Sequence, residues 1–353
     1  MQVNAGVNKI RVLVIDDSAL ARNVLSELIP AEGDIEVIGS APDPYVARDK
    51  IKRLNPDVLT LDVEMPRMDG ITFLSNLMRL RPMPVVMVSA LTEAGAKQTL
   101  RALTLGAADF VTKADMALGH NLSSFGQELR AKIRAAARAN LRAHVSRATA
   151  QPDRQPALPE QTRFGCIAIG ASAGGTEAIR TVVRDLPENA PALLICQHMP
   201  ALFTTSFATH LNECSRLSIT EARDGEPLKR GHGYLAPGDQ HLRVVRRGAD
   251  TICRLDAGAP VNRHRPAVDV MFESVAEHLG DTAIGVLLTG MGKDGARGLL
   301  QMRQAGAPTL VQDEATSLVW GMPGEAVRIA AADRQVPLGR VAGAIAALLL
   351  APG

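Results

Sequence analysis

Residues 165–183, GCIAIGASAGGTEAIRTVV, run from an apolar stretch through a glycine-rich turn into a segment with helical spacing. The apolar stretch CIAIGA has the length and composition of a buried strand, and the segment after the turn repeats apolar residues at helical intervals. A strand that leads directly into a helix is typical of parallel α/β sheets. The serine of the turn, Ser172, has three possible roles: a nucleophile on a sharp turn, part of a phosphate-binding loop, or the cap of the helix.

The same alternation of short apolar runs with helix-like segments extends along both halves of the chain. The apolar runs predict buried strands at 10–16, 58–63, 84–90, 108–113, 166–171, 192–198 and 284–290. Apolar residues at helical spacing predict helices at 18–29, 70–80, 177–186 and 267–279, and the C-terminal VAGAIAALLLAPG is expected to form a final core helix. No internal repeat relates the two halves. The fold class is therefore predicted to be α/β, with two independent domains.

The boundary between the domains is predicted from a change in composition between residues 126 and 163. That stretch is rich in Ala and Arg and then in Pro and Gln, and it contains no aromatic residue. Its first half is compatible with a helix that closes the first domain, whereas its second half cannot bury enough apolar surface to fold alone. We predict an N-terminal domain at 9–128, a linker at 129–162 and a C-terminal domain at 163–351.

Charge and composition argue against several classes of protein. The net charge is +2, so no strong field favours nucleic acid as a partner. The segment MQVNAGVNKIRVLVIDD is not a signal peptide, because its apolar run is short and ends in two aspartates, and no apolar stretch is long enough for a membrane span. The cysteines (Cys166, Cys196, Cys214 and Cys253) are widely spaced, which fits reduced thiols better than a zinc site. We expect a cytoplasmic protein with neither nucleic-acid binding nor membrane insertion.

Charged and hydroxyl side chains follow the predicted strands of the N-terminal half: Asp16, Asp17, Asp62, Ser89 and Lys113. Because the carboxyl ends of parallel strands meet at one edge of a sheet, these side chains are expected to lie close together. Three carboxylates repel one another unless they hold a hard cation, and Mg²⁺ fits such a site. The hydroxyl and the ammonium beside them suit the capture of a phosphoryl group on a carboxylate. Taken singly, the aspartates are also compatible with helix caps and the lysine with a surface charge.

With these five side chains in this order at the ends of predicted strands, residues 10–128 resemble the receiver domain of bacterial response regulators. The resemblance implies a flavodoxin-like parallel sheet. The resemblance implies that Asp62 is the phosphoacceptor and that Asp16, Asp17, Asp62 and the backbone carbonyl of Glu64 hold Mg²⁺. It implies contacts from Ser89 and Lys113 to the phosphoryl group, and it makes Phe110 the rotating aromatic switch. The alternative is a degenerate receiver that cannot be phosphorylated.

The turn around Ser172 fits the G-x-S-x-G pattern, but a nucleophilic serine also needs a base and an acid that orients the base. His198 follows one predicted strand and Asp294 lies in a glycine-rich loop after another, so all three would share the carboxyl edge of one sheet. The remaining histidines considered, His210, His232, His241 and His264, fall in a helix-like run or in turn-rich segments and are weaker candidates. A structural histidine and a nucleotide-binding loop are the alternatives, but together the three residues favour a hydrolase.

The motifs GASAGG, QHMP, YLAPGDQH, TGMGKDGARGL and WGMPGEA resemble the catalytic domain of the chemotaxis protein-glutamate methylesterases, the CheB family. The resemblance covers about residues 164–350 and implies a doubly wound α/β methylesterase domain. It implies the hydrolysis of glutamyl methyl esters on the cytoplasmic domain of methyl-accepting chemoreceptors, with deamidation of receptor glutamines and no cofactor for the ester reaction. Ser172 would then attack the carbonyl, His198 would carry the proton and Asp294 would orient the imidazole.

Two further expectations concern the surroundings of Ser172. The backbone N–H of Met291 is the best candidate for an oxyanion donor, and that of Ala173 is the second. Some relatives carry a threonine at the position of Ala173, so any hydroxyl contribution is absent here. Trp320, Met322 and Pro323 either line the substrate cleft or pack in the core, and the sequence does not separate these alternatives.

The order of the domains suggests regulation by phosphorylation. Our hypothesis is that the unphosphorylated receiver covers the Ser172 cleft and that phosphorylation of Asp62 by a chemotaxis histidine kinase uncovers it. Two alternatives remain open at this point: the same chemistry on a methylated signalling protein outside motility, and a phosphorylation-gated binding module without turnover.

Overall fold

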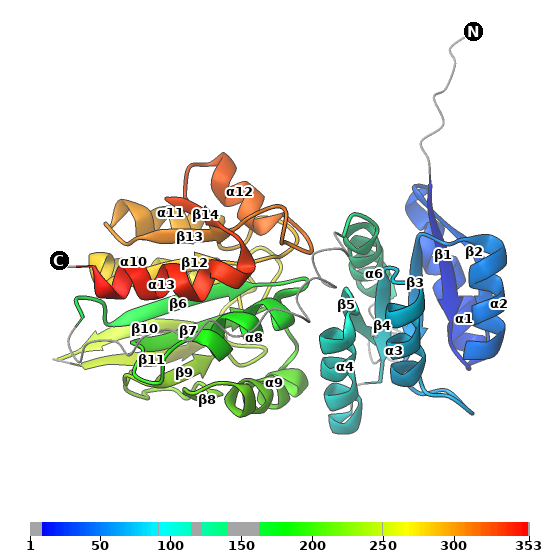
Figure 1. Ribbon diagram of the computed structural model, residues 1–353, viewed down its shortest axis with the longest axis horizontal. Helices are drawn as coiled ribbons and strands as arrows, with labels where there is room; N and C mark the ends of the chain where they lie inside the picture. The colour runs from blue at the N-terminus through cyan, green and yellow to red at the C-terminus, as the bar shows by residue number, and fades with distance from the viewer. Residues whose placement is uncertain (1–8, 91, 114–121, 140–161, 249, 352–353) are drawn as a thin grey trace, which may run out of the picture. The chain divides into compact units, whose positions relative to one another are not determined.

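The computed structural model describes residues 9–90, 92–113, 122–139, 162–248 and 250–351, which form two compact units (Figure 1). The chain divides into residues 1–141 and 142–353. Both units are α/β, as predicted from the alternation of apolar runs and helix-like segments.

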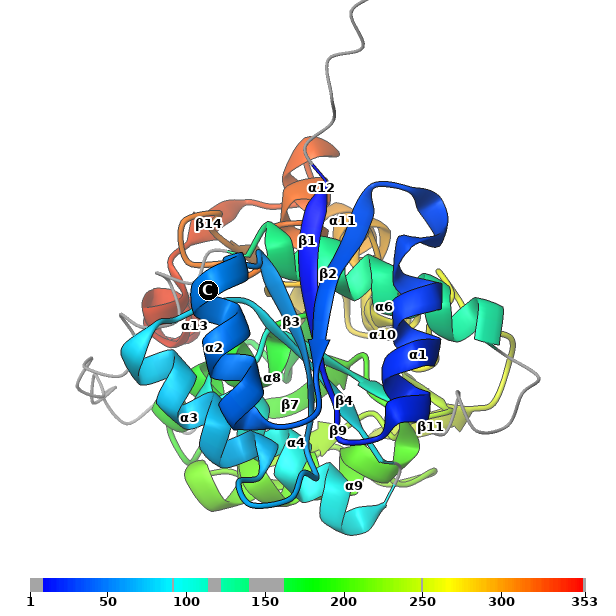
Figure 2. The ribbon, with the colours of Figure 1, turned by 90° about the vertical axis from the view of Figure 1, so that its right-hand side faces the viewer.

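The N-terminal unit contains five parallel strands in the order β2-β1-β3-β4-β5. Helices α1 and α6 cover one face of this sheet, and α2, α3 and α4 cover the other (Figure 2). This strand order is that of flavodoxin-like domains, in which ligands bind beside the carboxyl ends of the central strands. The elements are β1 (Ile10–Ile15), α1 (Ala19–Leu28), η1 (Ile29–Glu32), β2 (Ile35–Ala41), α2 (Pro44–Leu54), β3 (Val58–Asp62), α3 (Gly70–Leu80), β4 (Val85–Ser89), α4 (Glu93–Leu105), β5 (Asp109–Thr112) and α6 (Leu122–Ala137).

Local chemistry explains where several of these helices begin. The side chains of Ser18, Asp43, Asp69 and Thr92 each accept a hydrogen bond from a backbone N–H of the first turn of α1, α2, α3 and α4, respectively. Strands β3 and β4 are buried along their whole length, which explains why both appear in the sequence as apolar runs. Strand β2 was not predicted, because it lies at the edge of the sheet and most of its residues are only half-buried.

The N-terminal unit extends further along the chain than the sequence predicted. Helix α6 continues to Ala137, so the predicted boundary at residue 128 falls inside it. Arg130 donates from Nε to Glu32 at 3.0 Å, and Arg134 donates from Nε to Asp34 at 2.6 Å, which ties the end of the helix to the β2 side of the unit. The first domain therefore includes the Ala- and Arg-rich helix, and residues 140–161 of the predicted linker lie outside the described residues.

The C-terminal unit is built on seven parallel strands in the order β14-β13-β12-β6-β7-β9-β8, with β10 and β11 as a separate antiparallel hairpin. The strand positions predicted at 166–171, 192–198 and 284–290 correspond to the central strands β6, β7 and β12. The elements are β6 (Cys166–Ala171), α8 (Gly175–Asp185), β7 (Ala192–Gln197), α9 (Ala201–Cys214), β8 (Ser218–Glu221), β9 (His232–Leu235), β10 (His241–Arg247), β11 (Asp250–Asp256), α10 (Val268–His278), η3 (Gly280–Thr282), β12 (Ala283–Leu287), α11 (Ala296–Gln304), β13 (Thr309–Gln312), α12 (Met322–Arg328), β14 (Arg334–Val336), η4 (Leu338–Arg340) and α13 (Val341–Leu350).

Helices cover both faces of the seven-stranded sheet (Figure 1). Helices α8, α9 and α13 lie on one face, while α10, α11 and α12 lie on the other with the hairpin beside α10. The chain leaves β6 toward β7 on one side and later returns to β12 on the other side of β6. The strand order therefore reverses at β6, and such a switch point opens a crevice at the carboxyl edge of a doubly wound sheet.

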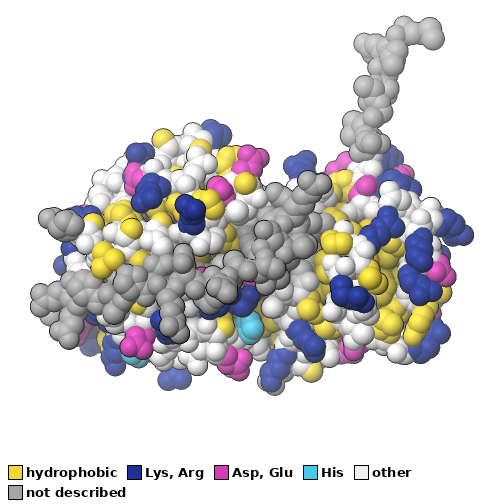
Figure 3. All heavy atoms as spheres, in the orientation of Figure 1, with side chains coloured by type: hydrophobic (Ala, Val, Ile, Leu, Met, Phe, Trp, Pro, Cys, Tyr) yellow, Lys and Arg dark blue, Asp and Glu magenta, His cyan; other side chains and the backbone are white. Residues whose placement is uncertain are grey.

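Three further observations concern the apolar segments, the surface and the cysteines. Within the described ranges, no helix combines the length and the hydropathy that a membrane span needs. On the face drawn in Figure 3, Lys and Arg side chains are scattered among apolar and acidic ones instead of forming one basic stripe. The four cysteines carry no disulfide, and three of them are buried.

Candidate active site

Ser172, His198 and Asp294 lie together at the carboxyl edge of the seven-stranded sheet, as predicted. Ser172 follows β6, the strand at the switch point. His198 follows β7 and Asp294 lies in the loop after β12, and these two strands flank β6 on either side. Nδ1 of His198 is 3.1 Å from Oγ of Ser172, and Nε2 of His198 is 2.7 Å from Oδ2 of Asp294. The three side chains form a continuous hydrogen-bonded array in which the imidazole joins the hydroxyl to the carboxylate.

The partners of His198 determine which ring nitrogen carries the proton. Asp294 can only accept when ionised, so the N–H of the neutral imidazole is on Nε2. Nδ1 is then the lone-pair nitrogen, and it faces the Ser172 hydroxyl. The side chain of His198 is only 8% exposed, so little water competes for either nitrogen.

Asp294 is held by four hydrogen bonds. Oδ2 accepts from His198 and from the backbone N–H of Val268 at 2.6 Å, and Oδ1 accepts from Nδ2 of Asn262 at 2.7 Å and from the backbone N–H of Asp269 at 3.2 Å. Burial opposes ionisation of this carboxyl, but the bonds from His198, Asn262 and Val268 outweigh it and lower the pKa of Asp294 to about 2. Two of the donors lie in the first turn of α10, whose dipole favours the same negative charge.

The turn that carries Ser172 is closed by hydrogen bonds to its backbone. The Ser172 N–H donates to the Thr289 carbonyl at 3.0 Å. The Ser172 carbonyl accepts from the Gly175 N–H at 2.7 Å and from Nε2 of Gln197 at 3.0 Å. Gly174 has a φ of +72°, whereas Ser172 is not among the described residues with positive φ. The left-handed position of this turn is therefore occupied by a glycine two residues after the serine, and the strained serine of a nucleophile elbow is not needed here.

The loop after β12 approaches the serine closely. A Cβ at Gly290 would lie 2.9 Å from Cβ of Ser172 and 2.2 Å from Sδ of Met322, so only glycine fits there without a shift. Within the described ranges, the backbone N–H groups of Met291 and Ala173 donate to no other group of the protein. Their role as oxyanion donors therefore stays a prediction that no protein hydrogen bond described here opposes.

Replacement of Gly290 by alanine is expected to lower the esterase kcat by about 10–100-fold, because the new methyl group pushes the Met291 loop away from Ser172. Gly165→Ala is the matched control, since a Cβ at Gly165 meets nothing within 4 Å. Turnover of an ester substrate and the thermal midpoint should be measured for both variants. A Gly290→Ala protein with the control's kcat would contradict the close approach.

Trp320, Met322 and Pro323 of the WGMPGEA motif differ in burial. Met322 is fully buried and belongs to the core cluster, and Pro323 is also buried, so these two residues pack in the core. Trp320 is half-buried, donates from Nε1 to the Gln312 carbonyl at 3.3 Å and pairs by its backbone with Gly290. Of the three, only Trp320 is partly exposed, and it lies beside Gly290 in the loop after β12.

Two side chains outside the predicted triad also contact it: Asn262, which the sequence did not single out, and His264, which the sequence makes a weaker candidate than His198. Asn262 donates from Nδ2 to Asp294 and to Asp269, and the ring of His264 stacks on that of His198 with centroids 3.7 Å apart and 12° between the planes. Both lie in the segment between β11 and α10, which is irregular and carries no periodic pattern. The available signal was Asn262 itself, since asparagine is favoured at turn positions with positive φ.

The second site lies at the carboxyl edge of the five-stranded sheet. Ligand oxygens of Asp16, Asp17 and Asp62 lie within 4.8 Å of one another. Nζ of Lys113 is 2.7 Å from Asp62 and 2.9 Å from Asp16, so one ammonium offsets part of the crowded negative charge. Burial, aided by the Asp16 carboxylate, raises the pKa of Asp62 to about 6 despite the ammonium. Such a set of oxygen donors with excess negative charge fits a hard cation such as Mg²⁺.

The remaining predicted residues of this unit lie on β4, on β5 and in the loop after β3. Oγ of Ser89 is buried at the end of β4 and accepts a 2.8 Å hydrogen bond from Oγ1 of Thr99 in α4. Phe110 is buried in β5, and Nζ of Lys132 lies 5.1 Å from the centroid of its ring. Glu64 follows Asp62 by two residues in the β3–α3 loop, and its side chain is exposed.

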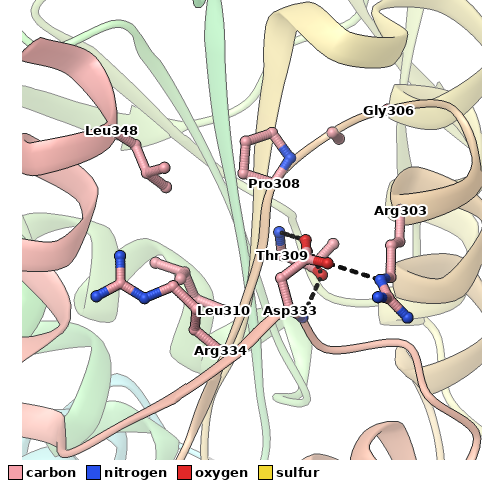
Figure 4. Close-up of a pocket in the computed structure, with 9 residues that line it drawn as sticks. Arg303, Gly306, Pro308, Thr309, Leu310, Asp333, Arg334 and Leu348 are labelled. Carbon is pink, nitrogen blue, oxygen red and sulfur yellow. Dashed lines mark hydrogen bonds and ion pairs between the residues drawn. The ribbon is translucent and has the colours of Figure 1, made fainter. Parts of the chain in front are cut away.

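A cavity of about 430 Å³ lies elsewhere, against the amino ends of β13 and β14 (Figure 4). Three of its polar residues pair with one another: Asp333 accepts from Arg303 at 2.6 Å and from the backbone and hydroxyl of Thr309 at 2.9 Å. This cavity is separate from the triad, which lies at the carboxyl ends of the strands.

Known proteins match both units. The CheB methylesterase family matches residues 167–345, and the response regulator receiver domain matches residues 12–118. A protein-glutamate methylesterase/protein-glutamine glutaminase of Xanthomonas euvesicatoria is 56% identical over 96% of this chain and 97% of its own length. The protein of the same name from Salmonella typhimurium is 53% identical over 95% of each. The crystal structure of the Thermotoga maritima CheB methylesterase catalytic domain matches with 35% identity and a TM-score of 0.52, covering 52% of this chain and 98% of that one.

These matches confirm the resemblance inferred from the sequence motifs in both halves, and with it the assignment to a class of hydrolases. The chain belongs to the CheB methylesterase family, with a response regulator receiver domain ahead of its methylesterase domain.

Proposed function

We propose that this protein is a phosphorylation-activated esterase that hydrolyses glutamyl methyl esters of methyl-accepting chemoreceptors and deamidates receptor glutamines. The observation that carries the proposal is the hydrogen-bonded array of Ser172, His198 and Asp294 at the switch point of the sheet. The family supplies the substrate, because its relatives are named protein-glutamate methylesterases/protein-glutamine glutaminases. Action on the cytoplasmic part of a receptor implies a cytoplasmic enzyme.

In the first half of the reaction, Oγ of Ser172 attacks the side-chain carbonyl carbon of the methyl ester. Nδ1 of His198, 3.1 Å from Oγ, takes the serine proton as the new C–O bond forms. The imidazolium that results faces the ionised Asp294 at 2.7 Å, which stabilises it. His198 then gives the proton to the departing methoxide, and methanol leaves an acyl-enzyme on Ser172.

In the second half, water attacks the acyl carbonyl while His198 takes a proton from it. His198 then returns this proton to Oγ of Ser172 as the C–Oγ bond breaks, which releases the glutamate side chain and restores the free serine. Each tetrahedral intermediate carries a negative oxygen, which the N–H groups of Met291 and Ala173 would stabilise. A glutamine substrate follows the same path with ammonia in place of methanol. None of these steps needs a cofactor.

In the receiver domain, Asp62 would accept a phosphoryl group from a chemotaxis histidine kinase. Asp16, Asp17 and Asp62 would hold Mg²⁺ together with the Glu64 carbonyl, and the metal would offset the charge of the transferred group. Lys113 already contacts Asp62, and Ser89 lies buried at the end of the next strand, so both would contact the phosphoryl oxygens. Phe110 would be the aromatic switch residue, whose ring rotates when Asp62 is phosphorylated.

The proposal is tested by methanol release from methylated chemoreceptor membranes, measured with and without Mg²⁺ and a small phosphodonor. We expect the intact protein to release methanol several-fold faster with the phosphodonor, and the Asp62→Asn protein to release it at one rate under both conditions. Removal of Mg²⁺ with a chelator should also abolish the stimulation. Asp49→Asn, an exposed change on α2, is the matched control and should keep it.

Two results would contradict the proposal. Full stimulation of Asp62→Asn would show that Asp62 is not the phosphoacceptor. Absence of release from the intact protein, while a reference esterase works on the same membranes, would point to another methylated protein or to a binding role without turnover.

A further inference from the structure

A tight turn at Val261–His264 places two side chains against the triad. The Val261 N–H donates to the His264 carbonyl at 3.0 Å, and the His264 N–H donates to the Val261 carbonyl at 2.9 Å. The two central residues, Asn262 and Arg263, have φ values of +52° and +70°. Two consecutive positive φ angles inside such a closed pair are the pattern of a type I′ turn, in which asparagine is favoured.

The segment that carries this turn is fixed at both ends. His241 is almost fully buried: its Nδ1 accepts from the Ala267 N–H at 3.2 Å and its Nε2 donates to the Ala259 carbonyl at 3.1 Å. Arg265 donates from one guanidinium nitrogen to the carbonyls of Ala257 and Gly258, both at 3.0 Å. Non-glycine residues with positive φ cost free energy, so they persist only where such contacts hold them.

The first side chain of the turn, Asn262, bridges two buried carboxylates. Its amide nitrogen donates one hydrogen to Oδ1 of Asp294 at 2.7 Å and the other to Oδ2 of Asp269 at 2.8 Å. Burial, together with the neighbouring Asp294, raises the pKa of Asp269, as expected for carboxylates that crowd each other. The amide separates the two acids and holds Oδ1 of Asp294, so that Oδ2 remains directed at His198.

The second side chain, His264, covers a face of the catalytic imidazole. The ring centroids are 3.7 Å apart and the planes are nearly parallel, so on this face His264 opposes rotation of His198 out of the plane that contains Ser172 and Asp294. One turn therefore constrains the acid through a hydrogen bond and the base through a ring contact. The side-chain hydrogen bonds described for Asn262 go to Asp294 and Asp269, so it reaches Ser172 only through the acid and the base.

We propose that the Val261–His264 turn positions the triad, with Asn262 orienting Asp294 and His264 holding the plane of the His198 ring. The inference rests on the proposed roles of Ser172, His198 and Asp294. Both residues act through another side chain, so they are positioning residues. Their loss should lower kcat and the reactivity of Ser172 while leaving KM for a small ester nearly unchanged.

The test uses two readouts on the full-length protein: kinetics with p-nitrophenyl acetate, and the rate at which a fluorophosphonate labels Ser172, followed by mass spectrometry. Labelling forms the Oγ–P bond, releases fluoride and passes the serine proton to His198, so it reports nucleophile activation without any receptor. The variants are Asn262→Gly, which keeps the left-handed backbone accessible, and the pair His264→Ala and His264→Phe. Arg263→Ala is the matched control, because this exposed residue lies at the neighbouring left-handed position.

We expect Asn262→Gly to lower kcat and the labelling rate together by about 10–100-fold, the range typical of residues that orient a catalytic side chain. His264→Ala should lower both by about 10-fold, and His264→Phe should restore most of the loss, since a phenyl ring supplies the same stack without a titrating nitrogen. Arg263→Ala should stay within about two-fold of the intact protein.

Other outcomes would overturn the proposal. If Asn262→Gly labels at the rate of Arg263→Ala, the amide does not position the acid. If His264→Phe is as slow as His264→Ala, a ring nitrogen matters and the stacking role is wrong. If Ser172 of the intact protein is not labelled even in the presence of Mg²⁺ and the phosphodonor, the triad and its positioning fail together. Labelling without methanol release from receptors would contradict only the proposed substrate.

Discussion

Replacement of Ser172 by alanine is expected to lower methanol release by about 10⁴–10⁶-fold, the range seen when the nucleophile of a serine hydrolase is removed. Oγ of Ser172 is the atom of the array that forms the acyl-enzyme, because His198 transfers the proton and Asp294 stabilises the imidazolium. The residual rate would come from the oxyanion donors and substrate binding alone. The fold should be unaffected, since among the described residues the hydroxyl hydrogen-bonds His198 alone, and the backbone bonds of the turn remain.

The control for this change is Ser206→Ala, the same substitution in α9 and away from the array. It should keep the rate of the intact protein, and all three proteins should share one thermal midpoint. If Ser172→Ala releases methanol faster than about one thousandth of the control's rate, another group attacks the ester.

The second large effect is expected for Asp294→Asn, with kcat lower by about 10³–10⁴-fold. Asparagine offers one acceptor oxygen where Asp294 uses two, and its amide nitrogen would face a donor: either His198 with Val268, or Asn262 with Asp269. Either orientation removes the negative charge that stabilises the imidazolium and favours the wrong tautomer of His198. The kinetics of a small ester and of Ser172 labelling should fall together.

Stability gives an independent check on Asp294. Its pKa in the folded protein, about 2, lies below the ordinary value of 3.8, so its ionised form stabilises the fold above the unfolded pKa. This contribution is lost as the pH falls through the folded pKa. The thermal midpoint of Asp294→Asn should therefore lie below that of the intact protein at pH 7, and the difference should shrink toward about pH 2.

Asp333→Asn is the matched control for the chemistry. Asp333 also accepts several hydrogen bonds, from Arg303 and Thr309, but it lies at the amino ends of the strands. This variant should lose stability and keep kcat. An Asp294→Asn protein that loses stability but not kcat would show that the carboxylate is structural.

The sequence alone was sufficient for the parts of the protein that depend on the parallel sheet. Buried central strands such as β6 and β12 appear as continuous apolar runs, and their carboxyl ends must meet at one edge. Ser172, His198 and Asp294 could therefore be grouped although they lie far apart in the chain. The same reasoning grouped Asp16, Asp62 and Lys113, which the structure brings within ion-pair distance.

Tertiary structure decided what no periodic pattern encodes. The edge strand β2 and the end of the N-terminal domain depend on partial burial and on long-range ion pairs such as Arg134 with Asp34. Which nitrogen of His198 faces the serine depends on the position of Asp294 behind it. In the sequence His264 falls in a turn-rich segment and is a weaker candidate than His198. Its stacking on His198 arises only when the Val261–His264 turn folds back over the sheet edge. Strand ends are fixed by local pattern and sheet geometry, whereas the packing of an irregular loop depends on contacts between residues distant in the chain.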